Sequence, residues 1–336
     1  MSGTIHDVLS YFREEAFHSR DLGDKFERLI AGYLTREPKY ADLFGGKVWL
    51  WTEWPHHNKM PDTGIDLVAE ETATGDVWAI QCKFWQPDSY VPKADIDSFL
   101  ATSSKHPFKK RLIVSTTDKW TSNAEDTIRN QQIPVVRMGI SDLVESAIDW
   151  SDFKLSRPAD LKLRDKKKLR KHQEAALNDV LGGLKQADRG KLIMACGTGK
   201  TFTALKIAEK LAPDAGTVLF LVPSISLISQ SLTEWCNEAE RPLSPFAVCS
   251  DPKVGRNDEE DISTSDLAYP AHTNARLLAQ QVKQKRTIDK KHVTVIFSTY
   301  QSIAVISEAQ KKFGLPEFDI VTRTIGRANT TTRNTS

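Results

Sequence analysis

The 336-residue sequence lacks any run of ~18 consecutive apolar residues, and its N-terminus lacks the apolar core of a signal peptide. These two absences argue against a membrane partner and predict a soluble, cytoplasmic protein. The sequence is also poor in cysteine, and no C-x-x-C pair occurs, which excludes a cysteine-based zinc site and a disulfide framework. A formal net charge of +2 means that overall charge does not by itself indicate a nucleic-acid partner.

Two halves of different composition are visible, and the length is sufficient for two domains. Seven of the eight tryptophans lie in the first 150 residues. Between the halves, residues 162–171 carry seven basic residues against the single acid Asp165. We predict a first domain over residues 1–155, a basic linker over 156–170, a second domain over 171–321 and a polar tail over 322–336.

The first half alternates helical and strand patterns. Apolar residues at three- and four-residue spacing predict an amphipathic helix around 26–34, and residues 65–70 and 77–85 read as two strands joined by the turn at Gly75. A strand at 111–116, a helix near 123–131 and a strand at 134–138 follow. This mixture predicts an α/β fold with a hairpin at its centre.

Polar residues gather on one face of the predicted hairpin. Strand alternation places Gln81 and Lys83 on one side, and Ile80 and Cys82 on the other. Asp66 lies on the preceding strand, close enough to share the polar face. An acid, an amide oxygen and an ammonium group that converge in this way suit metal-assisted hydrolysis of a phosphodiester.

The run GIDLVAE…WAIQCKFW, preceded by FERLIAGYL and followed by RLIVSTT, resembles the Mrr-like branch of the PD-(D/E)xK restriction nucleases. The resemblance implies a restriction-endonuclease-like α/β/α domain and Mg²⁺-dependent cleavage of double-stranded DNA. It implies that Asp66, Gln81 and the Cys82 carbonyl hold the metal, and that Lys83 positions the attacking water. It assigns Glu27 as a further acid, although a surface glutamate accounts for this residue equally well.

The second half repeats strand and helix more regularly. The stretch LIMACGTGKTFTALKIA reads as a strand at 191–195, a glycine loop and a helix at 200–211. Backbone N–H groups at such a helix N-terminus bind phosphate, Lys200 reaches the terminal phosphates, and Thr201 would ligate Mg²⁺. Further alternation to residue 321 predicts a parallel sheet covered by helices.

This half resembles the first RecA-like lobe of superfamily 2 helicases, whose phosphate loop reads A-x-x-G-x-G-K-T and so accommodates Met194. The resemblance implies an ATP site, with Gln173 recognising adenine. The remaining nucleotide-binding residues are Gly197, Thr198, Gly199, Lys200 and Thr201. The residues expected to contact the DNA backbone are Pro223, Ser224, Ser298 and Thr299. The basic run adds Lys166, Lys167 and Lys168 as DNA contacts, or else it is a solvated linker.

The helicase pattern stops at the strand PEFDIV, and no Asp or Glu occurs between Thr322 and Ser336. We therefore expect a nuclease with an attached lobe that binds ATP but does not hydrolyse it alone. The chain then resembles the N-terminal part of a larger restriction enzyme, cut within its motor. The alternatives are a non-catalytic nucleotide- and DNA-binding fragment and a decayed gene product. Possible partners are other restriction–modification subunits or a chain that supplies the missing lobe.

Overall fold

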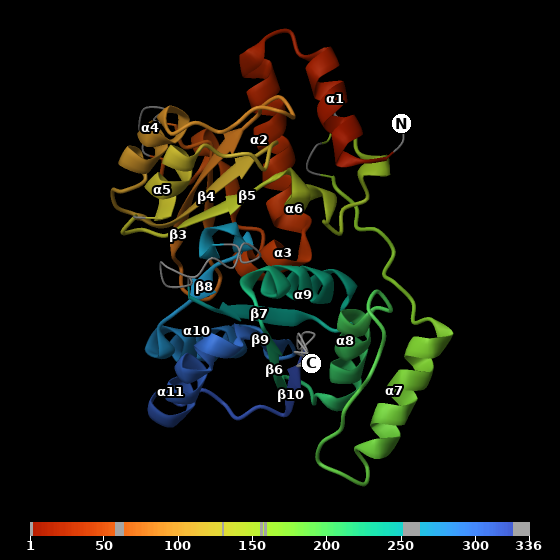
Figure 1. The fold of residues 1–336 in the computed structure, drawn as a ribbon. Coiled ribbons are helices and arrows are strands. Elements are labelled where there is room, and N and C mark those ends of the chain that lie inside the picture. Colours follow the sequence, from red (N-terminus) through yellow and green to blue (C-terminus); the bar gives the residue numbers. More distant parts are fainter. Residues whose placement is uncertain are drawn as a thin grey trace, which may run out of the picture.

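The computed structural model describes residues 3–57, 64–129, 131–154, 157, 160–250 and 263–324. Two five-stranded sheets with their covering helices lie one above the other in Figure 1. The predicted fold class is confirmed: a mixed α/β domain precedes a parallel α/β lobe. Within the described residues, none of the helices has the length and apolarity needed to cross a membrane.

The first sheet is mixed, with its first three strands antiparallel and the last three parallel to each other. In spatial order its strands are β1 (Val48–Leu50), β2 (Leu67–Glu70), β3 (Val77–Lys83), β4 (Phe108–Ser115) and β5 (Val135–Met138). The hairpin between β2 and β3 turns at Gly75, whose φ of 71° lies in the left-handed region that favours glycine. The hairpin that the sequence predicts is therefore present, and it lies inside the sheet, between β1 and β4.

Helices cover both faces of this sheet, as the alternation of β3 requires. The helices of the first domain are α1 (Ile5–Glu15), α2 (Ser19–Arg36), α3 (Pro38–Phe44), α4 (Ala94–Thr102), α5 (Ser122–Arg129) and α6 (Ile140–Val144). Trp78 and Ile80 pack in one core with α1, α2, α3 and α6, whereas Ala79 packs in a second core with α4 and α5.

The second sheet is entirely parallel. In spatial order its strands are β10 (Ile320–Arg323), β6 (Thr217–Val222), β9 (Val293–Thr299), β7 (Leu243–Val248) and β8 (Ala271–His272). Its helices are α7 (Lys171–Gly183), α8 (Lys200–Leu211), α9 (Ile225–Glu238), α10 (Ala275–Ile288) and α11 (Ile303–Phe313). Core packing places α8 and α9 on one face of the sheet, and α10 and α11 on the other.

The strand that the sequence predicts at 191–195 is absent, so that prediction is wrong. These residues have no regular structure, and Ile193 is 81 % exposed. A strand needs a hydrogen-bonded neighbour, and among the described strands β10 pairs with β6 alone. The outer edge of β10 therefore has no partner in the part of the chain that the structure describes, and Val321 is 59 % exposed. Strand β10 extends to Arg323, beyond the predicted end of the lobe at 321, and the rest of the predicted tail, 325–336, lies outside the described residues.

The two halves share one continuous apolar core, and buried polar contacts cross between them. Lys39 on α3 is buried and donates to the Thr233 hydroxyl on α9 at 3.3 Å. Asn237, also on α9, donates to the carbonyl of Glu145 at 3.2 Å. Tyr40 donates its hydroxyl to the carbonyl of Ala268. These contacts fix α9 against the end of the first domain.

Glu37, where α2 meets α3, gives this contact zone a dependence on pH. The residue is fully buried, its Oε2 accepts from the backbone N–H of Ala147 at 2.9 Å, and burial raises the pKa of its carboxyl to about 7. The pKa is higher in the folded chain than in the unfolded chain. Folding therefore gains stability from neutral Glu37 below about pH 4.5, and this contribution is lost as the pH rises through about 7.

We predict that Glu37→Gln removes this loss, because glutamine keeps an acceptor oxygen but cannot ionise. The variant should be more stable than the parent at pH 8.5, by about 3 kcal/mol in free energy of unfolding, and close to it at pH 5. Guanidinium unfolding at both pH values measures the difference. Glu14→Gln, an exposed control, should follow the parent at both. A Glu37→Gln curve parallel to that of the parent across this range would contradict the prediction.

Candidate active site and nucleotide site

Backbone pairing of the hairpin fixes Asp66 beside the end of β3. The Asp66 N–H donates to the carbonyl of Ile80 at 2.9 Å, one residue before β2 begins. Its carboxylate Oδ2 accepts from the backbone N–H of Cys82 at 2.6 Å. Because both the backbone N–H and the carboxylate of Asp66 are hydrogen-bonded to β3, the carboxylate stays beside the strand that carries Gln81 and Lys83.

Gln81 presents an amide oxygen with no hydrogen-bond partner among the described residues. The side chain is 2 % exposed, and its Nε2 donates to the carbonyl of Gly64 at 3.1 Å, which fixes the amide. Gly64 has a φ of 82°, and a Cβ there would lie 3.3 Å from the Ser98 hydroxyl, so glycine permits this close approach. A buried acceptor without a donor is costly unless a cation or water binds it. The oxygen therefore fits a hard metal ion.

Glu27 and Lys83 lie near the same point. Burial raises the pKa of the Cys82 thiol well above its ordinary value, and the nearby carboxylates of Asp66 and Glu27 raise it further, whereas Lys83 lowers it. Glu27 comes from α2, which contacts β3, and Phe26 packs edge-on against Phe84 at 5.5 Å. The charges of Asp66, Glu27 and Lys83 thus all act on the thiol of Cys82, the residue that follows Gln81 on β3.

The phosphate loop has the backbone that its sequence predicts. Gly197 and Gly199 have φ values of 75° and 80°, and Gly199 caps the N-terminus of α8, which begins at Lys200 as predicted. The Lys200 ammonium donates to the carbonyl of Ala195 at 3.0 Å, and the Thr198 hydroxyl donates to the same oxygen at 2.7 Å. The helix N-terminus, the two glycines and the lysine together fit a nucleotide phosphate group.

Gln173 is placed against this loop. Its Nε2 donates to the carbonyl of Thr198 at 3.0 Å, its Oε1 accepts from the N–H of Arg170 at 2.9 Å, and the residue is 5 % exposed. Gln173, which the sequence predicts to recognise adenine, is thus hydrogen-bonded directly to the phosphate loop. Thr201 is the second residue of α8, and its carbonyl accepts from the indole N–H of Trp235 at 3.0 Å.

The four residues expected to contact the DNA backbone lie at the carboxyl ends of two paired strands. Val222 is in register with Thr299, which brings Pro223 and Ser224 next to Ser298 and Thr299. The side chains of Ser298 and Thr299 are buried, and they donate to the Thr299 carbonyl at 3.0 Å and the Ser302 hydroxyl at 3.1 Å. These two residues shape the strand end from within, whereas Ser224 caps α9.

The basic run between the halves is largely bound to α9. The Lys167 ammonium lies 3.1 Å from Oε1 of Glu234, and its N–H donates to Glu238 at 2.6 Å. Lys166 donates to the carbonyl of Ala239. Among the described residues Lys168 has no such ion pair, so it is the one lysine of the three without an anchoring partner here.

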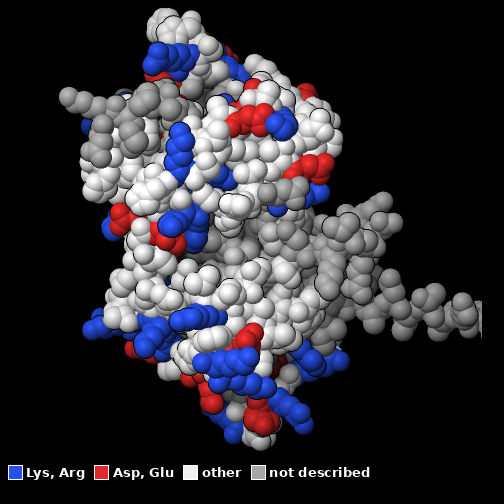
Figure 2. Space-filling model, turned by 90° about the vertical axis from the view of Figure 1, so that its left-hand side faces the viewer, with Lys and Arg blue, Asp and Glu red and all other residues white. Residues whose placement is uncertain are grey.

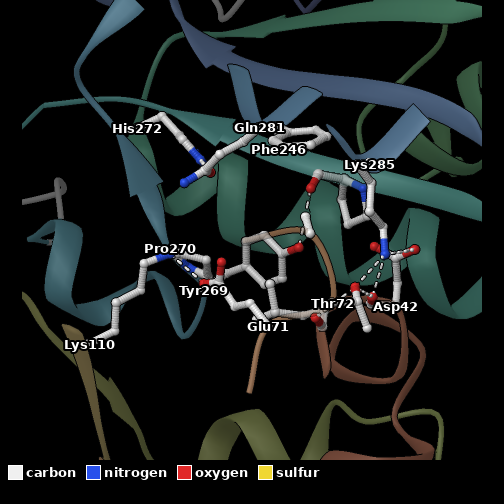
Figure 3. A pocket seen from close by; sticks show the side chains of 13 residues that line it. Asp42, Glu71, Thr72, Lys110, Phe246, Tyr269, Pro270, His272, Gln281 and Lys285 are labelled. Carbon is white, nitrogen blue, oxygen red and sulfur yellow. Dashed lines mark hydrogen bonds and ion pairs between the residues drawn. The ribbon is translucent and has the colours of Figure 1, made fainter. Parts of the chain in front are cut away.

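Buried charge at the junction of the halves was not foreseen from the sequence. Figure 3 shows a pocket in which the Lys285 ammonium lies against Asp42 and Thr72, and Lys110 against Glu71. Asp42, Asp289 and His292 come close enough to hold a metal ion. However, Lys285 lies 3.1 Å from Asp42 and 2.8 Å from Asp289, so a cation already compensates these acids.

Two family models match the two halves of the chain. Residues 35–160 match the family described as restriction endonuclease, and residues 166–322 match the family described as type III restriction enzyme, res subunit. The chain therefore carries an Mrr-like restriction endonuclease domain followed by a res-type helicase part. None of the proteins with curated descriptions matches the chain.

Two solved structures are similar. One is an ATP-dependent Type ISP restriction-modification enzyme, LlaBIII, bound to DNA, with 41 % identity, a TM-score of 0.79, and coverage of 93 % of this chain and 20 % of that one. The other is a nuclease-deletion mutant of the Type ISP enzyme LlaGI in complex with a DNA substrate mimic. It has 44 % identity over 47 % of this chain and 15 % of that one, with a TM-score of 0.40. The chain thus spans about a fifth of the length of the first enzyme.

The anchoring of the basic run leads to a quantitative prediction. Replacing Lys166, Lys167 and Lys168 together by Gln should lower the log–log salt slope of DNA binding by ~0.9, because Lys168 alone is available to a phosphate. Titrations at several KCl concentrations measure the slope. A fall of ~2.7 would instead mean that all three lysines contact phosphates and that the pairs with α9 open when DNA binds.

Proposed function

We propose that this chain is a Mg²⁺-dependent DNA endonuclease joined to an ATP-binding helicase lobe. The nuclease part of the proposal rests on the buried oxygen of Gln81, which has no hydrogen-bond partner among the described residues, and on the carboxylate of Asp66 fixed to Cys82. Both oxygens are hard ligands of the kind that Mg²⁺ prefers, and a glutamate from α2 lies close by.

We assign the oxygen-bearing residues of the site to the metal and the lysine to the phosphate and the attacking water. Asp66, the Gln81 oxygen and the Cys82 carbonyl would hold the metal, and Glu27 would supply a further acid beside them. Bound Mg²⁺ would supply a Lewis acid to the scissile phosphate. The Lys83 ammonium offsets the charge that develops on the phosphate and orients the attacking water. Duplex DNA is the substrate, and the similar Type ISP enzyme is described as bound to DNA.

The lobe binds ATP through the loop before α8. The phosphates would be contacted by Gly197, Gly199, Lys200 and the N–H groups of the first helical turn. Thr201 would ligate the accompanying Mg²⁺, and Gln173 would contact adenine. We expect residues 171–324 to bind nucleotide without turning it over by themselves, because residues 322–336 contain no Asp or Glu to hold the metal or orient water. A non-catalytic role in DNA and nucleotide binding is the alternative, and the cleavage assay below separates the two.

We predict that Asp66→Ala and Lys83→Ala each lower Mg²⁺-dependent plasmid cleavage by at least ~10²-fold, because both act on the charge of the reacting phosphate. Cleavage is followed by conversion of supercoiled plasmid to nicked and linear forms, without ATP. Asp188→Ala and Lys109→Ala, which are exposed controls of the same charge types, should cut like the parent. Parental rates in both site variants would refute the nuclease assignment.

Nucleotide binding supplies the next prediction. Lys200→Ala should abolish binding of a fluorescent ATP analogue, because the variant has no ammonium to face the phosphates. Lys210→Ala, at the other end of α8, should leave binding unchanged. Neither the parent nor either variant should release phosphate faster than background when DNA is present. Turnover by the parent that disappears in Lys200→Ala would overturn the view that this chain binds ATP without hydrolysis.

A further inference from the structure

The C-terminal ends of α10 and α11 meet at one end of the second sheet. Strand β9 lies between the two helices in the chain, so both helices run against the strand direction and end near the N-terminal ends of the strands. Arg286, in the last turn of α10, donates to the hydroxyl of Thr217, the first residue of β6. Asp319, which follows α11, accepts from the N–H of Thr217 at 2.8 Å. Thr217 therefore marks the point that both helix ends approach.

Four exposed lysines surround this end of the lobe. They are Lys283, Lys290, Lys291 and Lys311. In the described part of the chain, none of the four has a carboxylate within 4.0 Å, whereas Lys285 and Lys312 on the same helices are ion-paired. Figure 2 shows Lys and Arg side chains, with some Asp and Glu among them, over the lower part of the face that carries α10 and α11. We call these four residues the lysine cluster.

Stabilisation of the helix ends does not account for the lysine cluster. Cations in the last turn of a helix interact favourably with its dipole, and Lys311 is placed to do so. However, Lys290 and Lys291 lie beyond the end of α10, and Lys283 precedes its last turn. Three of the four positive charges therefore have no role in holding the fold together that the contacts of this structure reveal.

The lysine cluster is separate from the DNA contacts already proposed. Ser224 and Thr299 lie at the carboxyl ends of β6 and β9, whereas the cluster lies at the opposite ends of the same strands. A strand of six or seven residues spans roughly 20 Å, which exceeds the Debye length of about 8 Å at physiological salt. The two regions therefore act on a polyanion independently.

We propose that the lysine cluster binds the phosphate backbone of duplex DNA, as a second contact that is independent of sequence. The inference rests on the proposed function, since it supposes that DNA is the partner of this chain. Duplex DNA presents one charge per ~1.7 Å of its axis, a density that suits cations spread over two neighbouring helix ends. An acidic polypeptide is the competing partner, and the experiment below decides between them.

The test compares salt slopes of DNA binding. A variant with Lys283, Lys290, Lys291 and Lys311 replaced by Gln is titrated with a fluorescent duplex in EDTA, where no cleavage occurs, at several KCl concentrations. The log–log slope should fall by ~0.9 for each lysine–phosphate interaction that the substitutions remove, up to ~3.6 in total. A matched variant with Lys109, Lys154, Lys185 and Lys210 replaced by Gln has the same net charge and should keep the parental slope.

The outcomes separate this inference from the proposed function. If the parent binds the duplex and the cluster variant keeps its slope, the inference fails alone. If the parent binds no duplex, the proposed function fails together with the inference. Loss of binding to poly-L-glutamate with an unchanged DNA slope would assign the surface to an acidic polypeptide and overturn the proposal. Thermal unfolding of both variants at the parental midpoint confirms that the fold is retained.

Discussion

Helix α9 is the constraint on which the arrangement of the whole chain depends. Trp235 in its last turn packs against Phe220 and Phe297 of the sheet, at ring distances of 5.0 and 5.6 Å. The same indole donates to the first turn of α8, next to the phosphate loop. On either side of Trp235, Thr233 accepts a hydrogen bond from Lys39, and Asn237 donates one to the carbonyl of Glu145. Both partners belong to the first domain. One rigid helix, about 21 Å long, thus links the phosphate loop, the carboxyl end of β6 and the nuclease-like domain.

This arrangement has a consequence for communication between the two domains. A displacement of α8 when nucleotide binds would act on Trp235, and α9 would carry it to Lys39 in the buried contact zone. The zone contains the buried Lys39, whose ammonium is hydrogen-bonded to Thr233 within a packed core, so it resists gradual deformation. Any coupling between motor and nuclease through this path therefore proceeds between discrete arrangements.

Much of the fold could be predicted because local pattern and tertiary structure agree. Alternation along β3 places Trp78 and Ala79 in different cores, and the turn at Gly75 fixes the hairpin register that carries Asp66 to Cys82. The phosphate loop could also be predicted, because only glycine readily adopts the positive φ found at positions 197 and 199. These features depend on residues close in sequence, whose spacing already contains the geometry.

The features that escaped prediction depend on partners distant in sequence. Residues 191–195 are apolar enough for a strand, but no neighbouring strand is available in the described sheet. The basic run looked like a DNA-binding segment, yet Glu234 and Glu238, some 70 residues later, take up Lys167. The lysine cluster was missed for the opposite reason: its charges come from two helices and gather only when α10 and α11 pack side by side.

Among the described strands, β10 leaves one edge without a partner, and this bears on how the protein behaves in concentrated solution. An unpaired strand edge offers its N–H and C=O groups to any other chain, and long apolar edges of this kind promote self-association. Here the edge is four residues long and carries one charge, Arg323, while Val321 on the same strand is exposed. Salt screens that charge, so higher ionic strength, often added to keep DNA-binding proteins free of nucleic acid, removes part of the edge's protection. Conditions that purify the protein from DNA are therefore those in which its own sheets are most prone to pair.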